Sequence, residues 1–381
     1  MIHNSSNVSL SSASTRALQA AAIGMFALLA GCQTTKSPPA PLVQTPTATH
    51  EFTVNDNDDV IGRLQVTHAH AEDTLSDIAR RFNIGYEEIV RANPGVDPWL
   101  PKEGTPVILP TQFVLPDAPR EGIVINLAAL RLYYFPVPKK GEPQKVITHP
   151  IGIGLIGWKT PVGNTKVTGK RENPWWYPPA SVRKEHKEED GEILPAKVPP
   201  GPDNPLGQYA LTLDWPSYLI HGTNQPYGIG IRASHGCIRL YPEDIAQLFD
   251  QIPVGTKITV VNEPQVYGHR GDTIYLQSYP VLDDYPPLKK AERQKATKQK
   301  PGASKIAESK ARDSKNAATV AHADFANNPA VDHALIAELE KNPNGIALPI
   351  SLPQMTLQKF VAAAPQVENR LPDQATWDGV E

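Results

Sequence analysis

The chain reads Ser-His-Gly-Cys-Ile-Arg-Leu at residues 234–240, and Tyr-Leu-Ile-His-Gly-Thr at residues 218–223. The second run is an apolar strand that ends at His221. Sixteen positions separate His221 from Cys237, so the loop between them must fold back, and its glycines at 222, 228 and 230 favour such a return. A nearby imidazole can lower the pKa of a thiol and generate the nucleophilic thiolate. We therefore predict Cys237 as a nucleophile and His221 as its base, with His235 as the alternative base.

The residues next to the thiol suit acyl chemistry. Gly236 leaves room beside the sulfur for a substrate carbonyl, and the backbone N–H groups near Gly236 and Cys237 can form an oxyanion hole. Arg239 is a cation two residues beyond the thiol, suited either to a substrate carboxylate or to an internal salt bridge.

Three other interpretations of the thiol are open. Cys237 can be a structural cysteine between two core histidines. It can be a zinc ligand together with His221 and His235, although no second cysteine near it supports such a site. A papain-type peptidase uses the same groups, but there the cysteine precedes the histidine along the chain. We predict no metal and no cofactor.

Short β-branched runs surround the motif, from residue 120 to 263. Only residues 243–251 carry a clear helical pattern, with Ile245, Leu248 and Phe249 apolar. Many short strands with one helix predict a β-sandwich or an open barrel, and thus a mainly β domain. The expected strands are 123–127, 131–135, 145–148, 151–154, 218–221 and 257–261, of which the first two form a hairpin.

A second compact unit is expected over residues 63–111. Asp73 or Thr74 can cap a first helix, in which Leu75, Ile78, Ala79 and Phe82 recur at helical spacing. A second helix over 87–92 is broken at Pro94, and 105–110 is a short strand. The unit therefore predicts a small α+β module in the order strand, helix, helix, strand.

Both units resemble known families. His-Gly-Thr followed by Ser-His-Gly-Cys-Ile-Arg is similar to the signature of the L,D-transpeptidase (YkuD-like) catalytic domain of the ErfK/YbiS type. The module in front of it resembles LysM, which binds the N-acetylated glycan of peptidoglycan or chitin. The first resemblance implies a β-sandwich in which Cys237 is the nucleophile and His221 the proton acceptor and donor. It further implies a pocket and oxyanion hole shaped by Gly236, His235 and Ser234, and substrate contacts from Arg239 and Thr223.

The resemblance implies an activity. The thiolate would attack a tetrapeptide stem of peptidoglycan, release D-Ala and pass the acyl group to an amine. The acceptor would be a second stem, giving a 3→3 crosslink, or the lysine of a Braun-type lipoprotein. With water as acceptor the activity would be that of an L,D-carboxypeptidase. A contrasting possibility is a non-catalytic peptidoglycan-binding lipoprotein.

The N-terminus has the pattern of an export signal over residues 1–31, with Arg16 before a short apolar run. Leu-Ala-Gly-Cys at residues 29–32 resembles a lipobox, which implies lipidation at Cys32. The alternative is an ordinary secretory signal with an incidental cysteine. Residues 32–62 are expected to be a flexible tether, and Gln33 suggests the outer membrane over the inner one. We therefore expect a lipid-anchored periplasmic protein.

The net charge and the C-terminal segment add two further expectations. The formal net charge is -3, which does not favour nucleic acid as a partner. Residues 264–381 are expected to be a low-complexity tail, partly disordered, with Lys289 to Lys315 poor in apolar residues and 334–339 a possible short helix.

Overall fold

A computed structural model describes residues 51–282 except 56, 190 and 192, together with residue 284 and residues 328–370. The expected signal peptide, the lipidation at Cys32 and the tether up to residue 50 lie outside the described residues. So do residues 285–327 and 371–381 of the expected tail. None of the described helices has the length and hydrophobicity needed to cross a membrane.

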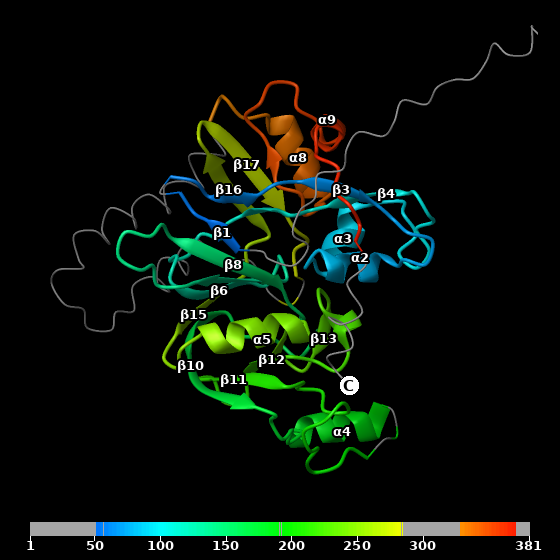
Figure 1. Ribbon diagram of the computed structural model, residues 1–381, viewed down its shortest axis with the longest axis vertical. Helices are drawn as coiled ribbons and strands as arrows, with labels where there is room; N and C mark the ends of the chain where they lie inside the picture. The colour runs from blue at the N-terminus through cyan, green and yellow to red at the C-terminus, as the bar shows by residue number, and fades with distance from the viewer. Residues whose placement is uncertain are drawn as a thin grey trace, which may run out of the picture. The chain divides into compact units, whose positions relative to one another are not determined.

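The main element is a nine-stranded sheet in the order β1-β8-β7-β6-β15-β10-β11-β12-β14 (Figure 1). Its neighbours pair antiparallel except β6 with β15 and β12 with β14, which are parallel. The ladder is continuous, so one curled sheet stands where the sequence suggested a sandwich or an open barrel. Its strands are β1 (Glu51–Thr53), β6 (Gly122–Asn126), β7 (Arg131–Phe135), β8 (Lys145–Pro150), β10 (Gly163–Glu172), β11 (Tyr209–Leu213), β12 (Leu219–His221), β14 (Ile238–Arg239) and β15 (Lys257–Val261).

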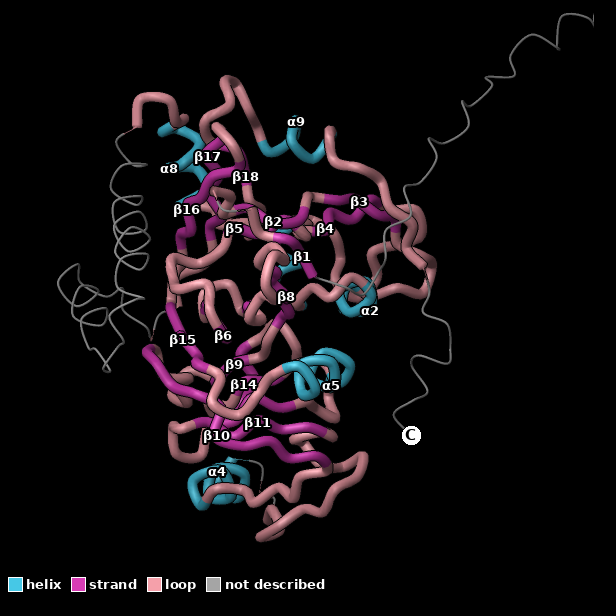
Figure 2. The backbone as a smooth tube through the Cα atoms, turned by 60° about the vertical axis from the view of Figure 1, so that its left-hand side comes forward, coloured by secondary structure: helices cyan, strands magenta, loops and turns pink. Residues whose placement is uncertain are grey.

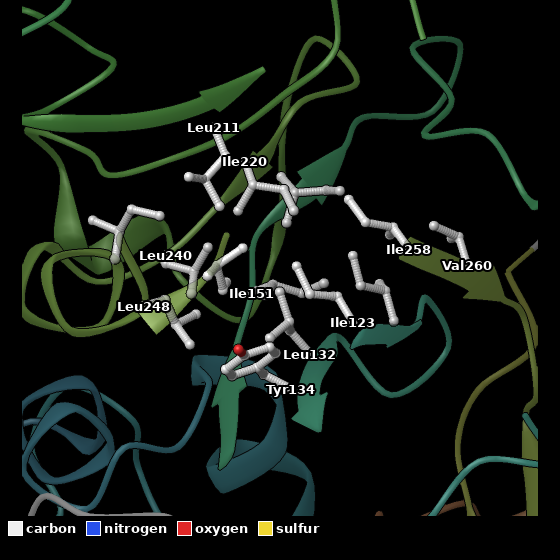
Figure 3. Close-up of a cluster of buried hydrophobic side chains, with 14 of the residues drawn as sticks. Ile123, Leu132, Tyr134, Ile151, Leu211, Ile220, Leu240, Leu248, Ile258 and Val260 are labelled. Atoms are coloured by element: carbon white, nitrogen blue, oxygen red, sulfur yellow. The ribbon is translucent and has the colours of Figure 1, made fainter. Parts of the chain in front are cut away.

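The largest apolar core is shared by both halves of this sheet. Side chains from β6 and β7, such as Ile123 and Leu132, gather with Leu211 of β11 and Ile220 of β12 (Figure 3). Helix α5 (Pro242–Gln251) adds Leu248 to the same cluster, which confirms the helix expected at 243–251. The hairpin of β6 and β7 is also as expected. Strand β12 is thus held by a buried residue directly before its terminal histidine.

The LysM-like unit has the expected order of elements. Strand β3 (Gln65–His68) pairs antiparallel with β4 (Pro106–Leu109), and α2 (Leu75–Arg81) and α3 (Tyr86–Ala92) lie between them in sequence. Thr74 is the N-cap of α2 in a reciprocal capping box with Asp77. Asn93 ends α3 and ties it to β4, because its side chain bonds to both the N–H and the carbonyl of Ile108.

The expected tether is wrong for residues 51–62. Strand β1 joins the edge of the large sheet beside β8, and β2 (Val60–Gly62) pairs with β5 (Gln112–Val114). Val54 and Ile61 are buried in a cluster with Phe113 and Val124. Residues 51–62 alone do not reveal these strands, because the strands that pair with them come from distant parts of the chain.

The expected tail also differs from the described residues. Strands β16 (Gln265–Arg270), β17 (Thr273–Ser278) and β18 (Leu348–Pro349) form a three-stranded sheet, beside which α8 (His333–Lys341) and α9 (Leu357–Ala362) lie (Figure 2). Helix α8 confirms the short helix at 334–339. Val367 packs into the LysM-like core, and Gln366 bridges to Val66 of β3. Apolar residues spaced along these segments are buried by one another and by the module, which the local composition did not show.

A helix over 180–189, a 3-10 turn over 226–228 and a short strand over 232–234 are not expected from the sequence, whereas the strand at 153–154 lies within the one expected at 151–154. Helix α4 (Ala180–Glu189) lies beside β10 and β11 at one end of the sheet (Figures 1 and 2). Its sequence is almost wholly polar, so periodicity gave no signal. A 3-10 turn spans Pro226–Gly228. Short strands β9 (Ile153–Gly154) and β13 (Arg232–Ser234) pair in parallel and hold the loop that precedes Cys237.

Candidate active site

The two parallel strands β12 and β14 place the predicted residues together. Ile220 is in register with Ile238, and His221 with Arg239. Cys237 directly precedes β14, so it lies two residues from Arg239 along the chain. Because side chains alternate between faces, Cys237, Arg239 and His221 share one face of the sheet. The electrostatic influence of Arg239 on both other groups agrees with this placement.

His221 is buried, with 3% of its surface exposed. Its Nδ1 lies 2.7 Å from the carbonyl oxygen of Gly222. A carbonyl only accepts hydrogen bonds, so Nδ1 carries the hydrogen and the lone pair of the neutral ring is on Nε2. Burial, and then the cation of Arg239, lower the pKa of His221 to about 3, against opposing effects of the carbonyls of Gly222 and Leu206. The imidazole is therefore neutral at physiological pH.

The Cys237 thiol is neutral as well. Burial raises its pKa above the ordinary value, while a backbone hydrogen bond at Leu219 and the cation of Arg239 act in the opposite direction. Its Sγ lies 3.7 Å from the carbonyl oxygen of Ser217. The sequence predicts a thiolate stabilised by an imidazole, and the resting pair differs from this because desolvation penalises both charged forms. Such a pair needs proton transfer to His221 during attack.

The turn before the nucleophile is held by its own polar groups. The Ser234 hydroxyl donates to the carbonyl of Cys237 and accepts from the N–H of Gly236 at 3.2 Å. Thr160 donates to the carbonyl of Gly236 at 2.8 Å. Gly236 has φ +101, and a Cβ there would lie 3.0 Å from the ring of Tyr218. Ser234 therefore fixes the turn, and the N–H of Gly236 already has an acceptor within it.

His235 contacts helix α4 and Trp158. Its Nε2 lies 2.7 Å from Oε2 of Glu185, which α4 supplies, and its ring packs edge-on against Trp158. Trp158 in turn donates from Nε1 to Oε1 of Glu185 at 2.9 Å. The carboxylate of Glu185 thus connects α4 to both His235 and Trp158.

Arg239 and Thr223 have different surroundings. The backbone of Arg239 exchanges two hydrogen bonds with Gly152, and its Nε is buried with no protein acceptor. Thr223 is 4% exposed, and its hydroxyl accepts from the N–H of Gln225 at 2.9 Å. Thr223 thereby holds the loop after His221, and a contact between Thr223 and substrate stays a prediction.

Sequence reasoning missed Glu185, Trp158 and Thr160 as site residues. Trp158 lies two residues before a Thr-Pro-Val-Gly stretch at 160–163, and Glu185 lies in a charged segment with no motif. Only the packing of α4 brings this carboxylate to His235. Among the described residues, no group of three or more His, Cys, Asp and Glu side chains is arranged to hold a metal ion.

Comparison with known proteins gives the same two units. Residues 120–260 match the family described as the L,D-transpeptidase catalytic domain, and residues 71–110 match the LysM domain. The probable L,D-transpeptidase YbiS of Escherichia coli (strain K12) is 45% identical over 242 residues, which cover 63% of this chain and 74% of YbiS. The probable L,D-transpeptidase YcfS of the same strain is 49% identical over 195 residues, which cover 50% of this chain and 59% of YcfS.

Among solved structures, an L,D-transpeptidase from Mycobacterium smegmatis is similar at 23% identity with a TM-score of 0.27, covering 36% of this chain and 57% of that one. The matched region covers about three fifths of YcfS and about three quarters of YbiS.

Proposed function

Because this chain belongs to the L,D-transpeptidase family, we propose that it is a cysteine acyltransferase acting on the stem peptides of peptidoglycan. The observation that carries the proposal is a neutral His221 whose strand pairs in register with the strand that follows Cys237, with its Nδ1 hydrogen donated to Gly222. That arrangement leaves a basic nitrogen on the face that holds the thiol.

In the first half-reaction the Sγ of Cys237 attacks the carbonyl of the L,D peptide bond in a tetrapeptide stem. The thiol proton passes to Nε2 of His221 as the S–C bond forms. His221 then protonates the leaving amine, D-Ala departs, and a thioester remains on Cys237. Since His221 has a low pKa, its conjugate acid is strong and returns the proton readily.

In the second half-reaction an amine attacks the thioester. His221 takes the proton of that amine and returns it to the departing sulfur, which restores the resting pair. The acceptor is a second stem, giving a 3→3 crosslink, or the lysine of a Braun-type lipoprotein, and water would give L,D-carboxypeptidase activity.

Arg239 and the nucleophile turn support the developing charges. The cation of Arg239 stabilises negative charge on Sγ, and its buried Nε is suited to a carboxylate of the stem. The N–H of Gly236 is used by Ser234 at rest, so we assign the oxyanion contact to the N–H of Cys237.

The LysM unit and the N-terminal pattern support the proposal that this chemistry takes place at the cell wall. A LysM module implies binding to the glycan of peptidoglycan. The lipobox-like run that ends at Cys32 implies a lipid anchor on the periplasmic side of a membrane. Gln33, which follows Cys32, favours the outer membrane.

Mass analysis of the products tests the proposal. The full-length protein is incubated with a disaccharide tetrapeptide and an amine acceptor. We expect release of D-Ala and a crosslinked or amine-capped product from the wild type, and none from Cys237→Ala. His221→Gln should lose about 10²- to 10⁴-fold in rate, the usual value of a general base.

Cys32→Ser is the matched control, because it removes the other cysteine and should leave the reaction with soluble substrate unchanged. Full activity of Cys237→Ala would remove the mechanism. A His221→Gln variant as active as the wild type would transfer the role of base to His235. Glycan binding without any product would favour the non-catalytic lipoprotein.

A further inference from the structure

The LysM unit contacts the loop that links the base to the nucleophile. Helix α3 begins at Tyr86, and the N–H groups of Tyr86 and Glu87 donate to the carbonyls of Ile229 and Gly230, both at 3.1 Å. The first N–H groups of a helix have no acceptor within it. Here those groups are satisfied by the backbone of the loop between His221 and Cys237.

The approach is close enough to require two glycines. A Cβ on Gly85 would lie 2.7 Å from Cα of Gly230, and a Cβ on Gly230 would lie 2.2 Å from the nitrogen of Tyr86. On its other side, the N–H of Gly230 donates to the carbonyl of Ile151 at 3.3 Å. The loop backbone at 229–230 is therefore clamped between the LysM unit and the segment that follows β8.

Buried polar contacts hold the same turn of the LysM unit against the catalytic sheet. Arg131, fully buried, makes two 2.8 Å bonds to Glu88 of α3, whose carboxylate also accepts from the N–H of Gly85 at 2.7 Å. Tyr241 donates to the carbonyl of Ile84 at 3.1 Å. Such contacts leave the turn little freedom to move relative to β7 and α5.

Loop residues 229–230 are connected directly to the nucleophile. Two residues further on, β13 begins at Arg232, and it ends at Ser234, whose hydroxyl bonds to the carbonyl of Cys237. Gly230 is thus four positions along the chain from Ser234, whose hydroxyl holds the turn that carries Sγ.

We propose that residues 84–87 of the LysM unit are a positioning element of the active site, which fixes Ile229 and Gly230 and through them the nucleophile turn. The LysM unit would then set the reactivity of Cys237 even toward substrates that carry no glycan. This inference deepens the proposed function and rests on it for the transfer reaction, but not for the reactivity of the thiol.

A pair of substitutions at one position tests the inference. Tyr86→Pro removes the side chain and the N–H that reaches Ile229 but suits the helix, since proline is favoured at the first helical position and the preceding Gly85 has a compatible φ of -79 and ψ of 154. Tyr86→Ala loses the same side chain and keeps the N–H. The two variants are compared in the full-length protein for alkylation of Cys237 by iodoacetamide and for transfer from a soluble tetrapeptide without glycan.

We expect Tyr86→Pro to lower both the alkylation rate constant and kcat by about tenfold or more relative to Tyr86→Ala, with KM little changed. Gly85→Ala provides a second, independent variant, because its backbone suits alanine and only the close approach to Gly230 and its neighbours is disturbed. Its control is Glu87→Ala, which keeps the N–H that bonds to Gly230.

Equal alkylation rates and kcat across Tyr86→Pro, Tyr86→Ala and Gly85→Ala would overturn the inference. If Tyr86→Pro lowers the melting temperature of the LysM unit, the comparison of Gly85→Ala with Glu87→Ala decides. A wild type that is alkylated but transfers nothing would contradict the proposed function, while the alkylation rates would still decide the role of the LysM unit.

Discussion

In the free protein, the thiol of Cys237 and the imidazole of His221 are both neutral at physiological pH. Desolvation raises the pKa of Cys237 and lowers that of His221, so a preformed thiolate–imidazolium pair is disfavoured. The cation of Arg239 assists ionisation of the sulfur and opposes protonation of the ring. The thiolate is therefore a minor species at neutral pH, and attack requires a proton to leave Sγ.

This arrangement predicts the pH dependence. Since the pKa of His221 is about 3, the base stays unprotonated as pH falls from 8 to 5, and kcat/KM should show no acidic limb near the ordinary histidine value. Since the pKa of Cys237 is raised, the rate of alkylation by iodoacetamide should still increase with pH above the ordinary thiol value. Stopped assays across the pH range check both.

Arg239→Gln should shift both the pH profile of kcat/KM and that of alkylation to higher pH. Without the cation, the pKa of Cys237 rises further and that of His221 moves back toward its ordinary value, so alkylation at pH 8 slows and an acidic limb appears at higher pH. Arg239→Lys is the control that keeps the charge. A wild-type acidic limb centred near pH 6.5 would contradict this account.

At the level of elements, the parallel pair β12 and β14 decides which side chains meet. A shift of register by one residue would place His221 and Arg239 on opposite faces. Helix α4 also contributes to the candidate site, although no sequence motif indicates this. Its Glu185 contacts His235 and Trp158.

The contact of α4 predicts an effect on the choice of acceptor. Glu185→Ala removes both ties between α4 and the nucleophile turn, so water gains access to the thioester. A side-chain hydrogen bond is worth about 0.5–1 kcal/mol, and if its loss fully exposes the thioester this corresponds to a two- to five-fold rise in hydrolysis relative to transfer. Product ratios by mass measure it, with Glu188→Ala in the same helix as the control. An unchanged ratio would mean that α4 does not limit water.

For the whole molecule, buried polar contacts join the LysM unit to the catalytic sheet. Arg131 and Glu88 are both almost fully buried, and Asn83 bonds to Asp244 of α5 beside the equally buried His149. The module is thus integrated into the fold at its second helix and at the segment around Val367, and it is more than a binding unit on a linker.

The buried ion pair predicts a large effect on stability. Glu88→Ala leaves the Arg131 guanidinium unpaired in the interior and should lower the free energy of unfolding by about 3–5 kcal/mol. The double variant Glu88→Leu with Arg131→Met removes both charges and should lose much less. Glu87→Ala, whose partner Arg91 is only four residues away, should cost about 0.5 kcal/mol or less. Urea unfolding measures all three, and a Glu88→Ala variant as stable as Glu87→Ala would refute the prediction.

Local patterns were enough for the order of the LysM elements, and they predict Cys237 as nucleophile and His221 as base. The motif around Cys237, the apolar strand before His221 and the capping of α2 at Thr74 are encoded in consecutive residues, because turns, caps and periodicity depend on near neighbours. The packing of distant segments decided the rest: the neutrality of the catalytic pair, the carboxylate of Glu185 beside His235, the clamp on Gly230, and the strands formed by residues 51–62 and 265–278. Burial and long-range pairing depend on which surfaces meet in space, and no short stretch of the chain contains that information.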